Sequence, residues 1–291
     1  MGVIGLGLMG APMARHLSRA GATVLVHNRS PGPVTAAVAD GLIAAPPADM
    51  ATRCDAIILM VSDTPAVQAI LQGTPGDAQG VTGLFGQAKP DTFIVDMGTT
   101  SVSDTKAFAK LASQNRLRWI DAPVSGGQLG AIEATLSIMV GGADADVAAI
   151  SPVLRVLGQR ITHVGPAGSG QIAKAANQAI VGMTIGAVAE ALALAKSAGA
   201  DPGKVRQALE GGFAWSRVME LHGARMVSGD FAPGGKVTTQ HKDMVQAATL
   251  AEALGLNLPA LQLNRELYGQ LIEQGHGGLD HSALFRLFDR P

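Results

Sequence analysis

The chain opens with Met1-Gly-Val-Ile-Gly-Leu-Gly-Leu-Met-Gly10, and this stretch decides the fold. An apolar run leads into the spacing G-x-G-x-x-G, which is formed by Gly5, Gly7 and Gly10. In a dinucleotide site the first glycine allows a sharp turn, the second lets a pyrophosphate come close, and the third lets helix and strand pack tightly. The stretch therefore predicts a strand, turn and helix that bind a dinucleotide, although one such motif also occurs in unrelated turns.

Composition narrows the class of protein. A chain of 291 residues is long enough for two domains with separate cores. Its formal net charge of -1 gives no basic surface for nucleic acid or for an acidic membrane. The single cysteine, Cys54, cannot form an internal disulfide, and we expect a buried residue at a strand start, not a nucleophile. With no targeting segment visible, we expect a cytoplasmic protein.

The first half of the chain alternates short apolar runs with segments of helical spacing. This alternation predicts βαβ units and an N-terminal Rossmann-type, doubly wound parallel sheet in an α/β protein. The expected strands are residues 3–4, 23–27, 56–61, 92–96, 118–121, 137–140 and 161–164, and the expected helices are 12–20, 31–40, 65–71 and 103–114.

Strand signals end near residue 165, so residues 165–291 are expected to form an all-α C-terminal domain that follows a dinucleotide-binding domain of residues 1–164. Residues 170–197 predict one long helix that joins the domains. Polar residues interrupt its apolar run, so we expect a covered helix of a homodimer or homotetramer, not a membrane span. Further helices are expected at 202–210, 216–226, 239–254, 259–273 and 280–288.

The residues after the second strand indicate which dinucleotide binds. An acidic residue about 20 positions after the glycines would bind the ribose 2′-OH of NAD. Here the sequence is His27-Asn-Arg-Ser30, which has no carboxylate to repel a 2′-phosphate. Arg29 can face that phosphate, while Asn28 and Ser30 can donate hydrogen bonds. We expect a preference for NADP(H), with NAD(H) possible; the alternative is that Arg29 is an ordinary solvated residue.

Three later motifs carry polar chemistry. Asp121-Ala-Pro-Val-Ser-Gly-Gly127 follows a strand and could form a small anion-binding nest. Gly168-Ser-Gly-Gln171 leads into the long helix, where Lys174, Asn177 and Gln178 share one face. His241-Lys-Asp243 lies in a later helical segment. Taken singly, the motifs also fit a turn, an interdomain ion pair and an ordinary charged helix.

Together and in this order, the motifs resemble the β-hydroxyacid dehydrogenase family over essentially the whole chain. The resemblance implies an NAD(P)-dependent oxidoreductase that acts on a CH–OH group and takes a short aldehyde acid as substrate. The reduction of tartronate semialdehyde to glycerate is the expected reaction. 3-Hydroxyisobutyrate, glyoxylate and succinic semialdehyde are alternative substrates. A cofactor-binding interaction protein without turnover is a further alternative, which the presence of Lys174 disfavours.

The resemblance also implies a role for each motif residue. Lys174 would be the general acid that protonates the carbonyl oxygen. Ser125, Gly126 and Gly127 would hold the substrate carboxylate, and Asn177 would orient the substrate's oxygens. No metal ligand is expected. The expected cofactor-binding residues are Gly5, Gly7, Leu8, Met9, Gly10, Asn28, Arg29, Ser30, Val61, Ser62, Thr99 and Lys242.

Overall fold

The computed structural model describes residues 1–73 and 83–289. The chain divides into two compact units, one of residues 1–174 and one that starts at residue 175. The helix α9 (Ser169–Ser197) begins in the first unit and continues into the second. The boundary expected between residues 164 and 165 falls just before this helix.

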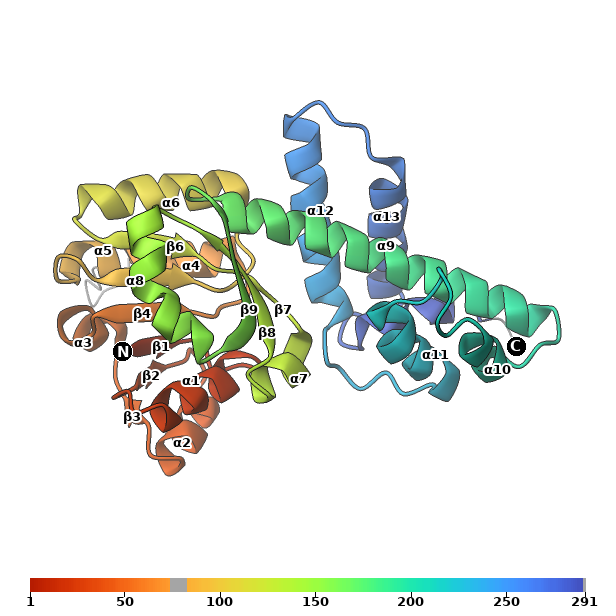
Figure 1. Cartoon of the computed structure of the whole chain (residues 1–291), viewed down its shortest axis with the longest axis horizontal. Coiled ribbons are helices and arrows are strands. Elements are labelled where there is room, and N and C mark those ends of the chain that lie inside the picture. Colours follow the sequence, from red (N-terminus) through yellow and green to blue (C-terminus); the bar gives the residue numbers. More distant parts are fainter. Residues whose placement is uncertain (74–82, 290–291) are drawn as a thin grey trace. The chain divides into compact units, whose positions relative to one another are not determined.

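The first unit is built on one sheet, which has nine strands within the described residues (Figure 1). The strand order is β3-β2-β1-β4-β5-β6-β8-β7, with β9 paired to β8. The first six strands in this order, from β3 at the edge to β6, are parallel to their neighbours. The strands are β1 (Gly2–Ile4), β2 (Leu25–His27), β3 (Ile43–Ala44), β4 (Ala56–Leu59), β5 (Phe93–Asp96), β6 (Arg118–Asp121), β7 (Val124–Ser125), β8 (Leu136–Gly141) and β9 (Gly158–Gly165).

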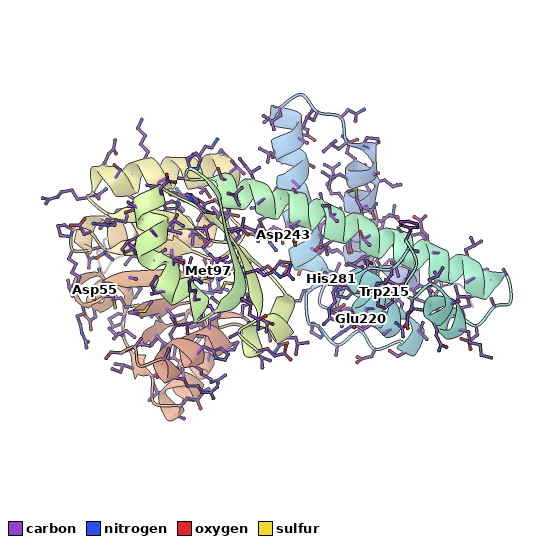
Figure 2. The ribbon with its side chains drawn as sticks, in the orientation of Figure 1. Asp55, Met97, Trp215, Glu220, Asp243 and His281 are labelled. Carbon is purple, nitrogen blue, oxygen red and sulfur yellow. The ribbon has the colours of Figure 1, made fainter. Side chains whose placement is uncertain are left out.

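Helices cover both faces of this sheet because its central strands are apolar on both sides. Val3, Ile58 and Val95 pack toward α1, α2, α7 and α8, whereas their neighbours Ile4 and Ile57 pack toward α3, α4, α5 and α6. Met97 lies inside the unit, whereas Asp55 projects from its surface (Figure 2). The helices are α1 (Gly10–Arg19), α2 (Pro31–Ala39), α3 (Pro47–Arg53), α4 (Thr64–Gln72), α5 (Leu84–Gln87), α6 (Val102–Gln114), α7 (Gly127–Ile132) and α8 (Asp144–Arg155).

The sheet departs from the expected parallel arrangement at one end. Strand β8 runs antiparallel to both β6 and β7, with Val124 opposite Ile138. A parallel pair needs a crossover of a dozen or more residues, and the link between β7 and β8 holds only the short helix α7. The doubly wound α/β class is confirmed, and the expectation of a uniformly parallel sheet is wrong for this region.

The secondary-structure elements of the second unit, within its described residues, are all helices. Helices α12 and α13 lie side by side (Figure 1), and Met244 of α12 shares a buried cluster with Tyr268 and Leu271 of α13. The segment expected as one helix at 216–226 contains a π-helix and a short α-helix, and the last expected helix is a 3-10 helix. The elements after α9 are α10 (Pro202–Ala208), η1 (Met219–Gly223), α11 (Ala224–Ser228), α12 (Val237–Ala253), α13 (Pro259–Glu273) and η2 (His281–Leu287).

Helix α9 alone among the described helices is long and apolar enough to cross a membrane by length and composition. The same test is passed by core helices of soluble proteins. In this chain, Ile185, Val188 and Leu192 of α9 are buried in the core of the helical unit. Packing inside the helical unit therefore accounts for these three apolar residues of α9.

Candidate active site

The carboxyl ends of neighbouring parallel strands meet at one edge of the sheet. From β2 through β1, β4 and β5 to β6, this edge carries Arg29, the glycine loop, Ser62, Thr99 and the loop that leads to Ser125. Five strands at about 4.8 Å spacing span about 19 Å. The glycine loop lies where the chain order reverses, between β2 and β4, which is the place where open α/β sheets bind ligands.

The structure gives a different reason for glycine at each position of the first motif. Gly5 has φ +100°, and a Cβ there would lie 2.3 Å from the carbonyl oxygen of Met60. A Cβ on Gly10 would lie 1.8 Å from the carbonyl oxygen of Gly5, so only glycine lets α1 start this close to β1. A Cβ on Gly7 would meet nothing within 4 Å. The fold therefore needs the outer glycines, whereas Gly7 borders open space, as expected of a residue that a pyrophosphate approaches.

Asn28 holds the glycine loop in place. Its Oδ1 accepts a hydrogen bond of 2.9 Å from the backbone N–H of Leu6, and its Nδ2 donates to the carbonyl of Ser30 at 3.1 Å. Arg29 and Ser30 are exposed. Asn28 thus positions the loop from the second strand, and a direct contact of all three residues with a cofactor stays a prediction.

The loop after β5, which carries Thr99, is fixed on both sides by buried polar side chains. Asp96 accepts hydrogen bonds from the N–H of Gly98 at 3.1 Å and from Oγ1 of Thr100 at 2.6 Å. Gln171 of α9 donates to the carbonyl of Gly98 at 3.0 Å and accepts from the N–H of Thr100 at 3.2 Å. After β4, Ser62 donates from its hydroxyl to Asp63 at 2.9 Å, next to the half-buried Val61.

Two consecutive glycines follow Ser125. Gly126 has φ +133° and Gly127 has φ +61°, and helix α7 begins at Gly127. A Cβ on Gly127 would meet nothing within 4 Å. Successive backbone N–H groups of a turn can form a concave binding site for an anion. That this loop holds the carboxylate of a substrate stays a prediction.

Lys174 is brought to the same loop. The residue is 8% exposed, and its Nζ donates a hydrogen bond of 2.9 Å to the carbonyl of Val124, directly before Ser125. The start of α9 is anchored by Asp121, which accepts hydrogen bonds from the N–H groups of Gly168 at 2.8 Å and Gln171 at 3.0 Å. Burial raises the pKa of Asp121, and these amide hydrogen bonds oppose that rise. The anchor sets the position of Lys174 one turn later.

The second unit holds a chain of polar side chains on α9 and α12, which we call the amide relay: Asn177, Gln178, Gln240, Asp243 and Lys242. Nδ2 of Asn177 donates to Oε1 of Gln178 at 2.7 Å. Nε2 of Gln178 donates to Asp243 at 2.6 Å and to Oε1 of Gln240 at 3.2 Å. The Asp243 carboxylate also lies 3.0 Å from Nζ of Lys242. The relay thus connects two predicted site residues, Asn177 and Lys242.

Family models match both parts of the chain. Residues 1–165 match the model described as the NAD binding domain of 6-phosphogluconate dehydrogenase. Residues 168–288 match the model described as NAD-binding of NADP-dependent 3-hydroxyisobutyrate dehydrogenase. The chain belongs to the β-hydroxyacid dehydrogenase family. This dehydrogenase is therefore an NAD(P)-dependent oxidoreductase that acts on the CH–OH group of a small molecule.

Named relatives support the family along the full chain. The dehydrogenase is 44% identical to 2-hydroxy-3-oxopropionate reductase of Escherichia coli, over 99% of this chain and 97% of the relative. It is 33% identical to 3-hydroxyisobutyrate dehydrogenase of Pseudomonas aeruginosa, over 98% and 97% of the two chains. A solved 3-hydroxyisobutyrate dehydrogenase from Salmonella typhimurium superimposes with a TM-score of 0.88 at 28% identity, with 98% of each chain covered.

Sequence reasoning missed several residues that position this site. No motif points to a role for Asp96 or Gln240, and Asp121 and Gln171 stand out in the sequence only as members of motifs. Each is a polar residue that the dehydrogenase buries, at 2% exposure or less. In the sequence, each of these residues is a polar residue inside or beside an apolar run. Burying such a residue costs free energy unless it forms hydrogen bonds, so its position indicates a buried partner.

Proposed function

We propose that this dehydrogenase reduces tartronate semialdehyde to glycerate with NADPH. The observation that carries the proposal is the ammonium of Lys174, held 2.9 Å from the carbonyl of Val124 beside the Ser-Gly-Gly loop. The substrate assignment is supported by the 44% identity to the Escherichia coli relative named 2-hydroxy-3-oxopropionate reductase.

The residues at the sheet edge fit a nicotinamide dinucleotide. Gly7 leaves open space at the start of α1, where free backbone N–H groups favour phosphates. Arg29 is the exposed cation after β2 and would bind a 2′-phosphate. Leu8, Met9, Val61, Ser62, Thr99 and Lys242 would complete the set of cofactor-binding residues. When bound, NADPH supplies the hydride that reduces the aldehyde carbon.

Lys174 would hold the proton that completes the reaction. As the aldehyde carbon gains a hydride, its oxygen becomes an alkoxide, which an ammonium group stabilises electrostatically. Nζ of Lys174 then gives one proton to that oxygen, and the product is the hydroxy acid. Ser125 and the N–H groups of Gly126 and Gly127 would hold the carboxylate, and Asn177 would orient the remaining oxygens.

A second candidate substrate is 3-hydroxyisobutyrate, because relatives from Pseudomonas aeruginosa and Salmonella typhimurium carry that name. The purified enzyme should reduce tartronate semialdehyde with NADPH at a higher kcat/KM than that with which it oxidises 3-hydroxyisobutyrate with NADP⁺. The opposite ranking would assign the second function. Glyoxylate and succinic semialdehyde complete the comparison.

The cofactor preference is tested separately with Arg29→Ala. Loss of the guanidinium should weaken NADPH by about tenfold, as expected for one charge-assisted contact, and leave NADH nearly unchanged. Fluorescence titration of both cofactors measures the two dissociation constants. Arg53→Ala, at another exposed arginine of the same unit, is the matched control. Equal weakening of both cofactors would remove Arg29 from 2′-phosphate recognition.

We also propose a homodimer or homotetramer in the cytoplasm. Ile180 and Leu194 of α9 are 63% and 72% exposed in the single chain, and large apolar side chains of this kind favour an interface. Light scattering after size-exclusion chromatography gives the mass of the assembly.

A further inference from the structure

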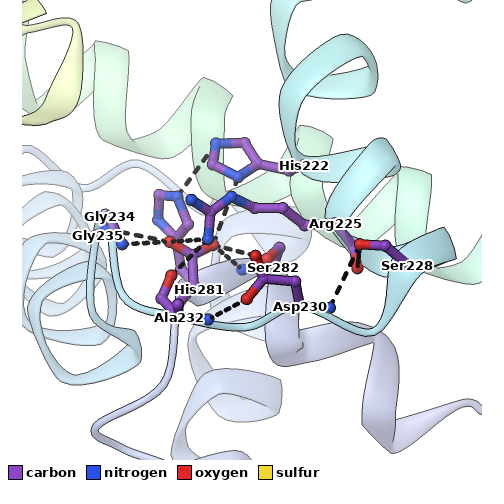
Figure 3. Close-up of polar contacts among 10 residues, drawn as sticks. His222, Arg225, Ser228, Asp230, Ala232, Gly234, Gly235, His281 and Ser282 are labelled. Atoms are coloured by element: carbon purple, nitrogen blue, oxygen red, sulfur yellow. Dashed lines mark hydrogen bonds and ion pairs between the residues drawn. The ribbon is translucent and has the colours of Figure 1, made fainter. Parts of the chain in front are cut away.

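A compact polar cluster in the helical unit lies outside every residue proposed for catalysis. It joins four segments: η1 with His222, α11 with Arg225, the turn at Gly234 and Gly235, and the start of η2 with His281 (Figure 3). Asp280, which caps η2, contacts residues of each of these segments. We call these residues the His222–His281 cluster. Its histidine and carboxylate ligand atoms all lie within 4.8 Å of one another.

Asp280 is the fixed anion of this cluster. It is 1% exposed and accepts hydrogen bonds from the N–H groups of Gly234 and Gly235, both at 3.0 Å. It also accepts bonds from the N–H of Ser282 at 3.1 Å and its hydroxyl at 2.6 Å. Burial raises the pKa of Asp280, but hydrogen bonds from His222 and Ser282 and the charge of His281 outweigh it and hold that pKa well below 3.8.

The carboxylate of Asp280 selects the tautomer of His222. Nδ1 of His222 faces Oδ1 of Asp280 at 3.5 Å, so an anionic oxygen favours the proton on Nδ1. The lone pair of His222 is then on Nε2. That atom lies 3.2 Å from Nε2 of His281, with the two rings nearly perpendicular at 84°. The ring centroids lie 4.4 Å apart in this T-shaped pair, so one ring must turn about its Cβ–Cγ bond before both Nε2 lone pairs meet at one ion.

We infer that this pair is a binding site for a divalent transition-metal cation of the zinc class. Two imidazole nitrogens on one tetrahedral zinc, each at about 2.0–2.1 Å, are about 3.3–3.4 Å apart. The observed 3.2 Å separation is close to that value. Asp280 takes the outer position, since a carboxylate on Nδ1 commonly orients a histidine that binds metal through Nε2. Binding moves the Nε2 proton of His281 to its Nδ1 or to solvent.

The surrounding charges and ligand types determine which cations the site binds. Nη1 of Arg225 lies 3.6 Å from Oδ2 of Asp280, so the guanidinium compensates the carboxylate. The ion then meets two neutral imidazoles, and water completes its coordination. Imidazole ligands suit zinc, copper and nickel rather than magnesium or calcium. The site therefore excludes the oxygen-seeking cations and binds zinc reversibly.

Zinc titration of the purified full-length enzyme after chelator treatment tests the inference. Calorimetry should give one zinc per chain, and His222→Gln or His281→Gln should weaken binding by at least about tenfold, a loss in the range known even for outer-shell changes. His276→Gln in the same unit and His163→Gln beside Asp144 are the matched controls and should bind zinc like the parent. Equal binding by all four variants, or no stoichiometric zinc, overturns the site.

A measurement without substitutions covers the case in which a variant fails to fold. Crystals of the unaltered enzyme soaked in zinc should show an anomalous peak about 2.0–2.1 Å from Nε2 of both His222 and His281. A peak only elsewhere on the molecule, or none at a zinc concentration that saturates the calorimetric signal, contradicts the inference. Magnesium titrated into the same enzyme in the calorimeter should give no stoichiometric binding.

Discussion

The two units hold their functional side chains in different ways. In the sheet unit, Asp96, Asp121 and Gln171 bind backbone N–H or C=O groups. In the helical unit, the amide relay runs mainly from side chain to side chain. Backbone partners are present whatever the neighbouring residue types are, whereas each step of the relay depends on two particular side chains. Damage to one step of the relay should therefore spread to the next.

The largest effect on activity is expected for a change of Lys174, the proposed general acid, which is the last residue of the sheet unit. Lys174→Ala removes the only group proposed to protonate the alkoxide, and kcat should fall about 10³-fold, within the range for general acid catalysis. NADPH binding should persist, because the proposed cofactor contacts lie on other residues. Stopped-flow reduction and fluorescence titration measure the two quantities. Lys196→Ala, on the same helix and paired with Asp289, is the control and should keep full activity.

Substitutions in the glycine loop of the sheet unit should have effects of intermediate size on stability and on cofactor binding. Gly10→Ala places a Cβ 1.8 Å from the carbonyl oxygen of Gly5, so the free energy of unfolding should fall by about 1–3 kcal/mol, as for overpacking. Gly7→Ala should leave that free energy within about 0.5 kcal/mol of the parent and weaken NADPH instead. Denaturant unfolding and cofactor titration distinguish these outcomes. A stable Gly10→Ala enzyme would disprove the close approach of α1 to β1.

The smallest effect tests the amide relay. Gln178→Leu removes the hydrogen bonds to both Asn177 and Asp243, so kcat/KM should fall about tenfold, which corresponds to about 1.4 kcal/mol. Gln240→Leu removes its two hydrogen bonds to Gln178 but leaves those of Gln178 to Asn177 and Asp243 in place, and should cost less than about threefold. If the two variants lose equal activity, or lose only thermal stability, the relay does not position Asn177.

The sequence predicted the structure best where a short local pattern of residues is sufficient to determine an element. The glycine loop, the apolar central strands and α9 were predicted because their patterns are local. Strands β3 and β7 have two residues each and leave no periodic signal, and α8 contains Pro152. The contact of Asn28 with Leu6 and that of Gln178 with Asp243 join residues 22 and 65 positions apart. Such pairing follows from topology, which local patterns do not encode.

The same limit applies to the His222–His281 cluster. The ring of His281 lies against the ring of His222 within the helical unit. Fifty-nine positions separate the two histidines, and neither shares a motif with the other. Only the folded chain brings both histidines to the same buried carboxylate.

The anchoring of α9 by Asp121 has a consequence for the time scale of local opening. The first amides of a helix normally lack partners and exchange with deuterated solvent rapidly. In this chain the amides of Gly168 and Gln171 are bonded to a buried carboxylate. Their protons should therefore be among the slowest to exchange, which makes them reporters of global unfolding of the sheet unit instead of helix fraying.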